Sequence, residues 1–134
     1  MKKSLSLLLL NSASVTLASP IAATEAQITE ALNVAANQIN ASAPSKKNDG
    51  GAMLIKAIAG PGRAFAYMYV DPTPVAEWSQ ERRSFTKKRL HDTYCDAKQM
   101  QFFRDYGILV RYVTNDKEGN QVFNYTFTPN DCKH

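Results

Sequence analysis

Apolar side chains recur every three or four positions between Thr24 and Ala41, which is the spacing of one helix face. The stripe consists of Ile28, Leu32, Ala35, Ala36 and Ile39. Thr24, Glu25 and Gln27 suit the first turn of a helix. We therefore predict a helix over residues 24–41.

A hairpin is predicted after the polar loop that follows this helix. Ala52–Ala59 is an apolar run, and Ala64–Val70 is rich in aromatic residues, so both read as strands. Between them, Pro61 presets one turn position and Gly62 supplies the positive φ of the next, as a type II turn requires.

The second half of the chain predicts helices and then another hairpin. Residues 75–106 contain no Gly or Pro and should be helical, with a bend or break near residues 92–96. Residues 108–114 and 121–128 alternate between apolar and polar positions around a polar turn. The order α-β-β-α-α-β-β predicts an α+β fold, in which an antiparallel sheet of two hairpins is covered on one face by helices.

The N-terminal segment has the order of a secretory signal peptide. Basic residues in Met1–Lys3 precede an apolar run at Leu5–Leu10 and then a stretch of small residues. We expect cleavage after Ala18 or Ala23, so that residues 1–23 form the leader.

The remaining residues, 24–134, are then a single domain that is periplasmic or secreted. The alternative is an uncleaved amphipathic anchor, which Asn11 disfavours because it interrupts the apolar run too early for a membrane span. No cysteine lies near the cleavage region, so we expect no lipid attachment and no stable membrane anchor.

Composition limits the class of protein further. The chain has 134 residues, of which 44% are hydrophobic and 21% charged, so it is neither disordered nor a multi-span membrane protein. Without Lys2 and Lys3, 14 basic residues face 12 acidic ones. A net charge of about +2 is too small to indicate nucleic acid as a partner.

Cys95 and Cys132 are the two cysteines of the chain. In an oxidising compartment an even number predicts a disulfide, which would close a loop of about 37 residues and stabilise the domain by about 3 to 4 kcal/mol. The alternative is a thiol nucleophile at Cys95 with His91 one helical turn before it. No third orienting group supports that alternative.

Two features predict a binding surface. All 13 aromatic residues lie at or beyond Phe65, and a sheet covered on one face cannot bury all of them, so an apolar groove should remain. Five basic residues also cluster within eight positions, as a solvated helix face or as a docking surface for an acidic partner. They are Arg82, Arg83, Lys87, Lys88 and Arg89.

Catalytic chemistry has little support in the sequence. A small secreted hydrolase would have to use His91 with carboxylates such as Asp92, Asp96 or Asp131. No nucleophile–base motif and no cluster with metal-ligand spacing is present. We therefore expect no enzyme activity, catalytic residue, cofactor or metal.

The C-terminal half of the chain contains four short motifs that form a familiar pattern. They are Tyr94-Cys95-Asp96, Phe103 with Tyr106-Gly107-Ile108, Asn115-Asp116 with Gly119-Asn120-Gln121, and Asp131-Cys132. With these motifs the chain resembles the α/β class of type II secretion pilotins. It is also similar to the quorum-sensing-regulated virulence factors, exported domains of similar length.

The resemblance implies a periplasmic, non-catalytic adaptor that holds a protein segment in an apolar groove, with a role in secretion or virulence. It also implies one disulfide, whose first cysteine closes a helix and whose second follows the last strand. Such pilotins are usually lipid-anchored through an N-terminal cysteine, which this chain lacks. We place the partner-binding groove at Phe102, Phe103 and Tyr106. The alternative is an inhibitor or immunity protein, which also needs only a binding surface.

Overall fold

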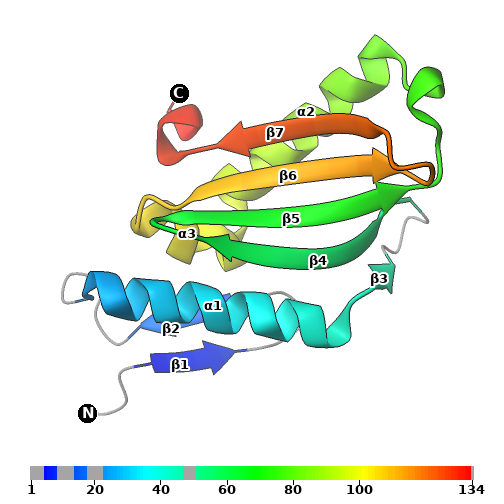
Figure 1. Ribbon diagram of the computed structural model, residues 1–134. Helices are drawn as coiled ribbons and strands as arrows, with labels where there is room; N and C mark the ends of the chain where they lie inside the picture. Colours follow the sequence, from blue (N-terminus) through cyan, green and yellow to red (C-terminus); the bar gives the residue numbers. More distant parts are fainter. Residues whose placement is uncertain (1–4, 9–13, 18–22, 47–50, 134) are drawn as a thin grey trace.

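The protein is an α+β sandwich of one sheet and its covering helices, seen in a computed structural model that describes residues 5–8, 14–17, 23–46 and 51–133 (Figure 1). The sheet has the strand order β3 (Ser45–Lys46), β4 (Met53–Gly60), β5 (Ala64–Asp71), β6 (Leu109–Asp116) and β7 (Gln121–Phe127). The helices are α1 (Glu25–Ser42), α2 (Gln80–Asp96) and α3 (Gln101–Asp105), with short 3-10 turns η1 (Val75–Glu77), η2 (Lys98–Met100) and η3 (Pro129–Cys132).

The central strand pair of the sheet is parallel. Strands β4 and β5 form one antiparallel hairpin and β6 and β7 the other, as predicted, but β5 and β6 run in the same direction from Ala64↔Leu109 to Asp71↔Asp116. The α+β class is confirmed, whereas the expected antiparallel arrangement fails at the junction of the two hairpins, where β5 and β6 are parallel. The reason is the long connection through α2, which returns the chain to the start of β5 before β6 begins.

Helix α1 begins where the sequence predicted. The Thr24 hydroxyl accepts a hydrogen bond from the Gln27 backbone N–H at 3.1 Å, and the Gln27 side chain accepts one from the Thr24 N–H at 2.9 Å. This capping box satisfies two of the free N–H groups of the first turn. The helix runs alongside β4 (Figure 1) and buries its predicted apolar stripe.

The predicted long helix is divided into α2 and α3. Ser79 caps the start of α2, with its hydroxyl accepting from the Arg82 N–H at 3.0 Å. The break falls at Ala97, whose backbone is extended. Arg104 donates hydrogen bonds to the carbonyls of Tyr94 (2.7 Å) and Ala97 (2.9 Å) and so ties α3 to the end of α2.

One face of the sheet forms the core and the other is open. Phe65, Tyr112 and Phe127 are buried on the covered face, where Tyr94 of α2 stacks on Phe127 at a ring distance of 6.2 Å. On the open face Ile58 is 43% exposed. The expected one-sided covering is thus confirmed.

The leader lies largely outside the described residues. Within it the structure gives two short paired strands, β1 (Leu5–Leu8) and β2 (Ser14–Leu17), and the cleavage position at Ala18 is outside the described part. The division into a leader over residues 1–23 and a domain therefore stays a prediction. No helix in the described part of the chain combines the length and apolar character needed to cross a membrane.

Candidate functional site

The N-terminal half of α2 covers the sheet without packing tightly on it. Tyr94 is the one buried side chain among the 17 residues of α2, all of which the structure describes, whereas α1 buries six. The sequence explains the difference, because residues 80–90 are mostly polar or charged. The buried part of helix α2 is therefore its C-terminal end, and its N-terminal half contacts the domain through polar side chains.

A cavity of about 190 Å³ lies beneath this half of α2. We call it the α2 groove. Its apolar lining comes from the sheet, from the residue that follows η1 and from α2. Its polar lining comes from the end of β5, from β6 and from α2. The residues that line it include Tyr69, Asp71, Trp78, Arg82, Phe85, Arg89, Leu90 and Phe123.

The floor of the α2 groove is largely aromatic. The rings of Trp78 and Phe123 meet edge to face with centroids 5.8 Å apart, and the Trp78 ring N–H donates to the Thr73 carbonyl at 3.2 Å. Burial raises the pKa of Tyr69 to about 12, so its hydroxyl stays protonated at neutral pH. An apolar side chain is therefore the natural occupant of this floor.

Arg82 lies at the rim of the groove against Trp78. Its guanidinium is 3.9 Å from the Trp78 ring centroid, a cation–π contact. It also donates to the Thr73 hydroxyl at 3.1 Å and lies 3.7 Å from the buried carboxylate of Asp71. The Arg82 side chain is nevertheless 42% exposed, so it is accessible from solvent.

Phe85 projects beside the groove into solvent. It is 63% exposed, the largest exposed fraction among the large apolar side chains of the described residues. The Arg89 guanidinium lies 5.9 Å from its ring. An exposed aromatic ring next to an apolar cavity is typical of a binding surface.

The five clustered basic residues have different roles. Arg83 donates to the carbonyls of Val122 and Val75 and so fastens α2 to β7 and η1. Lys88 forms an ion pair with Asp92 at 2.9 Å, and Lys87 lies 5.4 Å from the Tyr125 ring. Arg82 and Arg89 line the groove. The cluster is thus partly structural and partly a groove rim.

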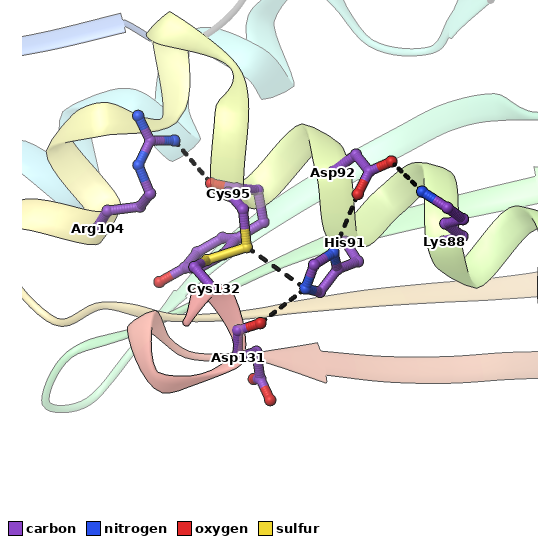
Figure 2. A network of polar contacts seen from close by, with 8 residues as sticks. Lys88, His91, Asp92, Cys95, Arg104, Asp131 and Cys132 are labelled. Atoms are coloured by element: carbon purple, nitrogen blue, oxygen red, sulfur yellow. Dashed lines mark hydrogen bonds and ion pairs between the residues drawn. A yellow bond between two sulfur atoms is a disulfide. The ribbon is translucent and has the colours of Figure 1, made fainter. Parts of the chain in front are cut away.

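The predicted disulfide joins Cys95 and Cys132, with Cα atoms 5.4 Å apart. His91 lies beside it (Figure 2), with Nε2 2.7 Å from the Asp131 carbonyl and 3.6 Å from the Cys95 sulfur. Its Nδ1 is 3.1 Å from the Asp92 carboxylate. The Asp131 carbonyl, followed by the Asp92 side chain, raises the pKa of His91. Together the bridge and the imidazole hold η3 to α2.

His91 meets the Asp92 carboxylate in this cluster, but the other groups that the hydrolase alternative names there have structural partners. Asp131 offers His91 its backbone carbonyl, while its carboxylate accepts from the Thr128 N–H at 2.8 Å and caps η3. The Cys95 sulfur is held in the disulfide. His91 does not line the α2 groove. Among the described residues no group of three or more His, Cys, Asp or Glu side chains could hold a metal ion.

The residues predicted to bind a partner lie in the core. Phe102, Phe103 and Tyr106 are 7%, 0% and 7% exposed, and the Phe103 ring is 5.3 Å from that of Phe65. None of the three lines the α2 groove. Their role in partner binding stays a prediction, whereas the most exposed of the large apolar side chains in the described residues, Phe85, lies on the N-terminal half of α2.

Sequence reasoning missed the groove. Two features of the sequence could have indicated it. Trp78 and Phe85 lie on the same side of the predicted helix, and the basic cluster overlaps them. Nothing in the sequence indicates that Asp71, at the end of β5, lies against Arg82, because that contact depends on how α2 crosses the sheet.

Comparison with known proteins identifies the fold. No family model and no curated protein matches the sequence. Among solved structures, the EpsS pilotin of the Vibrio vulnificus type 2 secretion system superposes with a TM-score of 0.67 at 15% identity, over 82% of this chain and 96% of that one. The type II secretion pilotin AspS from Vibrio cholerae gives 0.63 at 17% identity, over 81% and 94%. The chain has a pilotin-like fold.

A third structure with this pilotin-like fold is a candidate secreted protein from Pseudomonas aeruginosa. It superposes with a TM-score of 0.69 at 14% identity, over 81% of this chain and 96% of that one. The resemblance to pilotins that the C-terminal motifs indicated is thus confirmed for the fold. The superpositions cover nearly the whole of each relative, so the likeness concerns the complete domain.

Proposed function

We propose that this protein is an exported, non-catalytic adaptor that holds a segment of a partner protein in the α2 groove. The observation that carries the proposal is the apolar cavity beneath a helix that stands off the sheet, with the exposed ring of Phe85 at its side. The pilotin-like fold supports a role in secretion, because two of the similar structures are pilotins of type II secretion systems.

The size of the groove favours a protein partner over a small molecule. Its volume of about 190 Å³ is below the roughly 300 to 1,000 Å³ that is typical of small-molecule sites. A cavity of this size admits an anchor side chain of a bound segment. Apolar burial would then supply affinity, as when an amphipathic helix lies in a groove.

The disulfide supports export. Disulfides persist in oxidising compartments and are rare in the cytosol. The Cys95–Cys132 bridge fixes η3 to the last turn of α2, so it also anchors the helix that forms the groove. Oxidation outside the cytosol is therefore part of how the proposed binding surface is built.

Affinity capture with three variants of the purified mature domain tests this function. Phe85→Ser removes the exposed ring, while Ile58→Ser removes a 43% exposed apolar side chain from the open face of the sheet and is the matched control. Gln101→Arg adds bulk at an exposed position of α3 next to Phe102 and so tests the alternative surface.

We expect Phe85→Ser to lose a partner that the wild type, Ile58→Ser and Gln101→Arg all retain. Loss with Gln101→Arg and retention with Phe85→Ser would move the site to Phe102, Phe103 and Tyr106. Equal recovery with every variant would contradict both locations.

A further inference from the structure

We propose that the α2 groove selects an acidic amphipathic segment, in which an apolar side chain enters the cavity and a neighbouring Asp or Glu pairs with the guanidinium of Arg82. This inference rests on the proposed function and specifies the chemistry of the partner. The adaptor role alone does not explain why two arginines, Arg82 and Arg89, line a groove whose other side chains are mainly apolar. The proposed partner chemistry does explain it.

Arg82 has the geometry of a carboxylate receptor. Its contacts with the Trp78 ring at 3.9 Å and with the Thr73 hydroxyl hold the guanidinium in place, so less side-chain entropy remains to be lost on binding. Its contact with Asp71 is 3.7 Å, longer than the roughly 2.7 to 2.9 Å of a strong charge-assisted hydrogen bond. Because the Arg82 side chain is 42% exposed, a carboxylate that arrives from solvent can make the shorter contact.

The charge around the groove has one sign on the helix side. Residues 82–89 contain five basic residues and no acidic residue. Arg82 and Arg89 line the cavity, and they are the charged residues that α2 contributes to its lining. Asp71 on the sheet side is 4% exposed, so a partner at the rim meets mainly the arginines. Such complementarity favours anionic partners and sets specificity.

The aromatic floor favours a ligand with an apolar group over a purely ionic one. Trp78, Leu90 and Phe123 line the cavity beneath the arginines, and Phe85 flanks it. These four side chains give a phosphate little to bind, because the Trp78 ring N–H is already bound to the Thr73 carbonyl. A segment that carries both an apolar anchor and a carboxylate uses the floor and the rim together, which a nucleic-acid backbone cannot do.

Fluorescence anisotropy with three labelled model peptides tests the proposal. The first is a helical peptide of Leu and Glu with one apolar face, the second is its Leu and Lys twin, and the third replaces the leucines of the first with serine. The domain variants are Arg82→Gln/Arg89→Gln and, as a matched control with the same change in net charge, Lys98→Gln/Lys117→Gln at two exposed positions. Thermal denaturation checks that each variant is folded.

We expect the acidic amphipathic peptide to bind at least about tenfold more tightly than either of the other peptides. Arg82→Gln/Arg89→Gln should remove that advantage, while Lys98→Gln/Lys117→Gln should keep it. The single variant Arg89→Gln, which leaves the Arg82 contacts intact, should give an intermediate loss and serves if the double variant does not fold.

Three results would overturn the proposal: equal binding of the acidic and basic peptides, no binding of the acidic peptide, or acidic binding that the arginine variants leave unchanged. Competition by a single-stranded oligonucleotide with the same affinity would indicate a nucleic-acid site instead. The adaptor role is tested separately, because Phe85→Ser can abolish partner capture even if the partner proves not to be acidic.

Discussion

The side chain of Asn40 makes both outward-facing backbone hydrogen bonds of Ala57. Its amide nitrogen donates to the Ala57 carbonyl at 3.0 Å, and its amide oxygen accepts from the Ala57 N–H at 2.8 Å. Ala57 is 2% exposed and lies beyond the two positions at which β3 pairs with β4. The helix thus replaces a missing neighbouring strand and protects this edge of the sheet.

Asn40→Ala should destabilise the domain by about 1 to 3 kcal/mol, because it leaves a buried N–H and a buried carbonyl of β4 unpaired. Urea denaturation followed by circular dichroism measures the change. Asn37→Ala, at an exposed position of the same helix, is the control and should change stability by less than about 0.5 kcal/mol. Equal losses for the two variants would show that the Asn40 contacts contribute nothing.

Replacement of both cysteines by serine should cost about 3 to 4 kcal/mol, since the bridge closes a loop with a sequence separation of 37. Denaturation with and without reductant measures it. Reductant should destabilise the wild type to the level of the Cys95→Ser/Cys132→Ser variant and leave the variant unaffected. A wild type that is insensitive to reductant after unfolding and refolding would contradict the prediction.

His91 should make stability depend on pH. Its pKa is raised in the folded state, so its contribution is fully present below the unfolded value of about 6.5 and is lost as the pH rises through the folded pKa. The melting temperature of the wild type, relative to that of His91→Gln, should therefore fall as the pH increases from about 5 to 8. The second histidine is present in both proteins and cancels in this difference. A difference that stays constant across this range would exclude a stabilising charge on His91.

Asp116 organises the turn between β6 and β7. Its carboxylate accepts from the backbone N–H groups of Val75 (2.9 Å), Glu118 (3.0 Å) and Asn120 (2.9 Å). The Val75 N–H is the main cause of its lowered pKa. Stabilisation from this carboxylate is therefore present above the unfolded pKa and is lost as the pH falls through the folded pKa.

Asp116→Asn should lower the melting temperature at neutral pH, because the amide places N–H donors against backbone donors. Asp105→Asn, at an exposed position of α3, should have little effect. Differential scanning calorimetry compares the two. The loss caused by Asp116→Asn should shrink in acid, and a loss that grows on acidification would refute the assignment.

Truncation to alanine should lower the stability of the domain at Phe103 and have little effect on it at Phe85. Phe103 is fully buried against Phe65, so Phe103→Ala should destabilise the domain by about 3 to 5 kcal/mol. Phe85→Ala should change stability by less than about 0.5 kcal/mol, because the ring is 63% exposed. Chemical denaturation of both variants tests the prediction. A large loss with Phe85→Ala would mean that the ring supports the fold and is not free to bind.

The sequence was sufficient to predict the elements because their signals are local. The apolar stripe from Ile28 to Ile39 predicts a helix, the Pro61–Gly62 pair predicts a turn, and the alternation along β6 predicts a strand. None of these predictions needs knowledge of the neighbouring elements. The positive φ of Gly62 and the buried stripe confirm these signals. The pairing of Cys95 with Cys132 followed from their number and from the predicted export.

The parallel pairing of β5 with β6 and the α2 groove could not be predicted in this way. Alternation decides which face of a strand is buried and does not decide which strand lies next to it. Phe102 and Phe103 carry the same aromatic signal whether they fill a core or line a groove. The Asp71–Arg82 contact depends on the path of α2 across the sheet, which no local pattern encodes.

Photo-cross-linking in intact cells tests most directly whether a partner occupies the α2 groove. The photoreactive residue p-benzoylphenylalanine would replace Phe85 in the exported protein, with Ile58 and Gln101 as comparison positions on the open sheet face and on α3. We predict a discrete protein adduct from position 85 and none from position 58. An adduct that forms from position 101 and not from position 85, or equally from all three, would contradict the account.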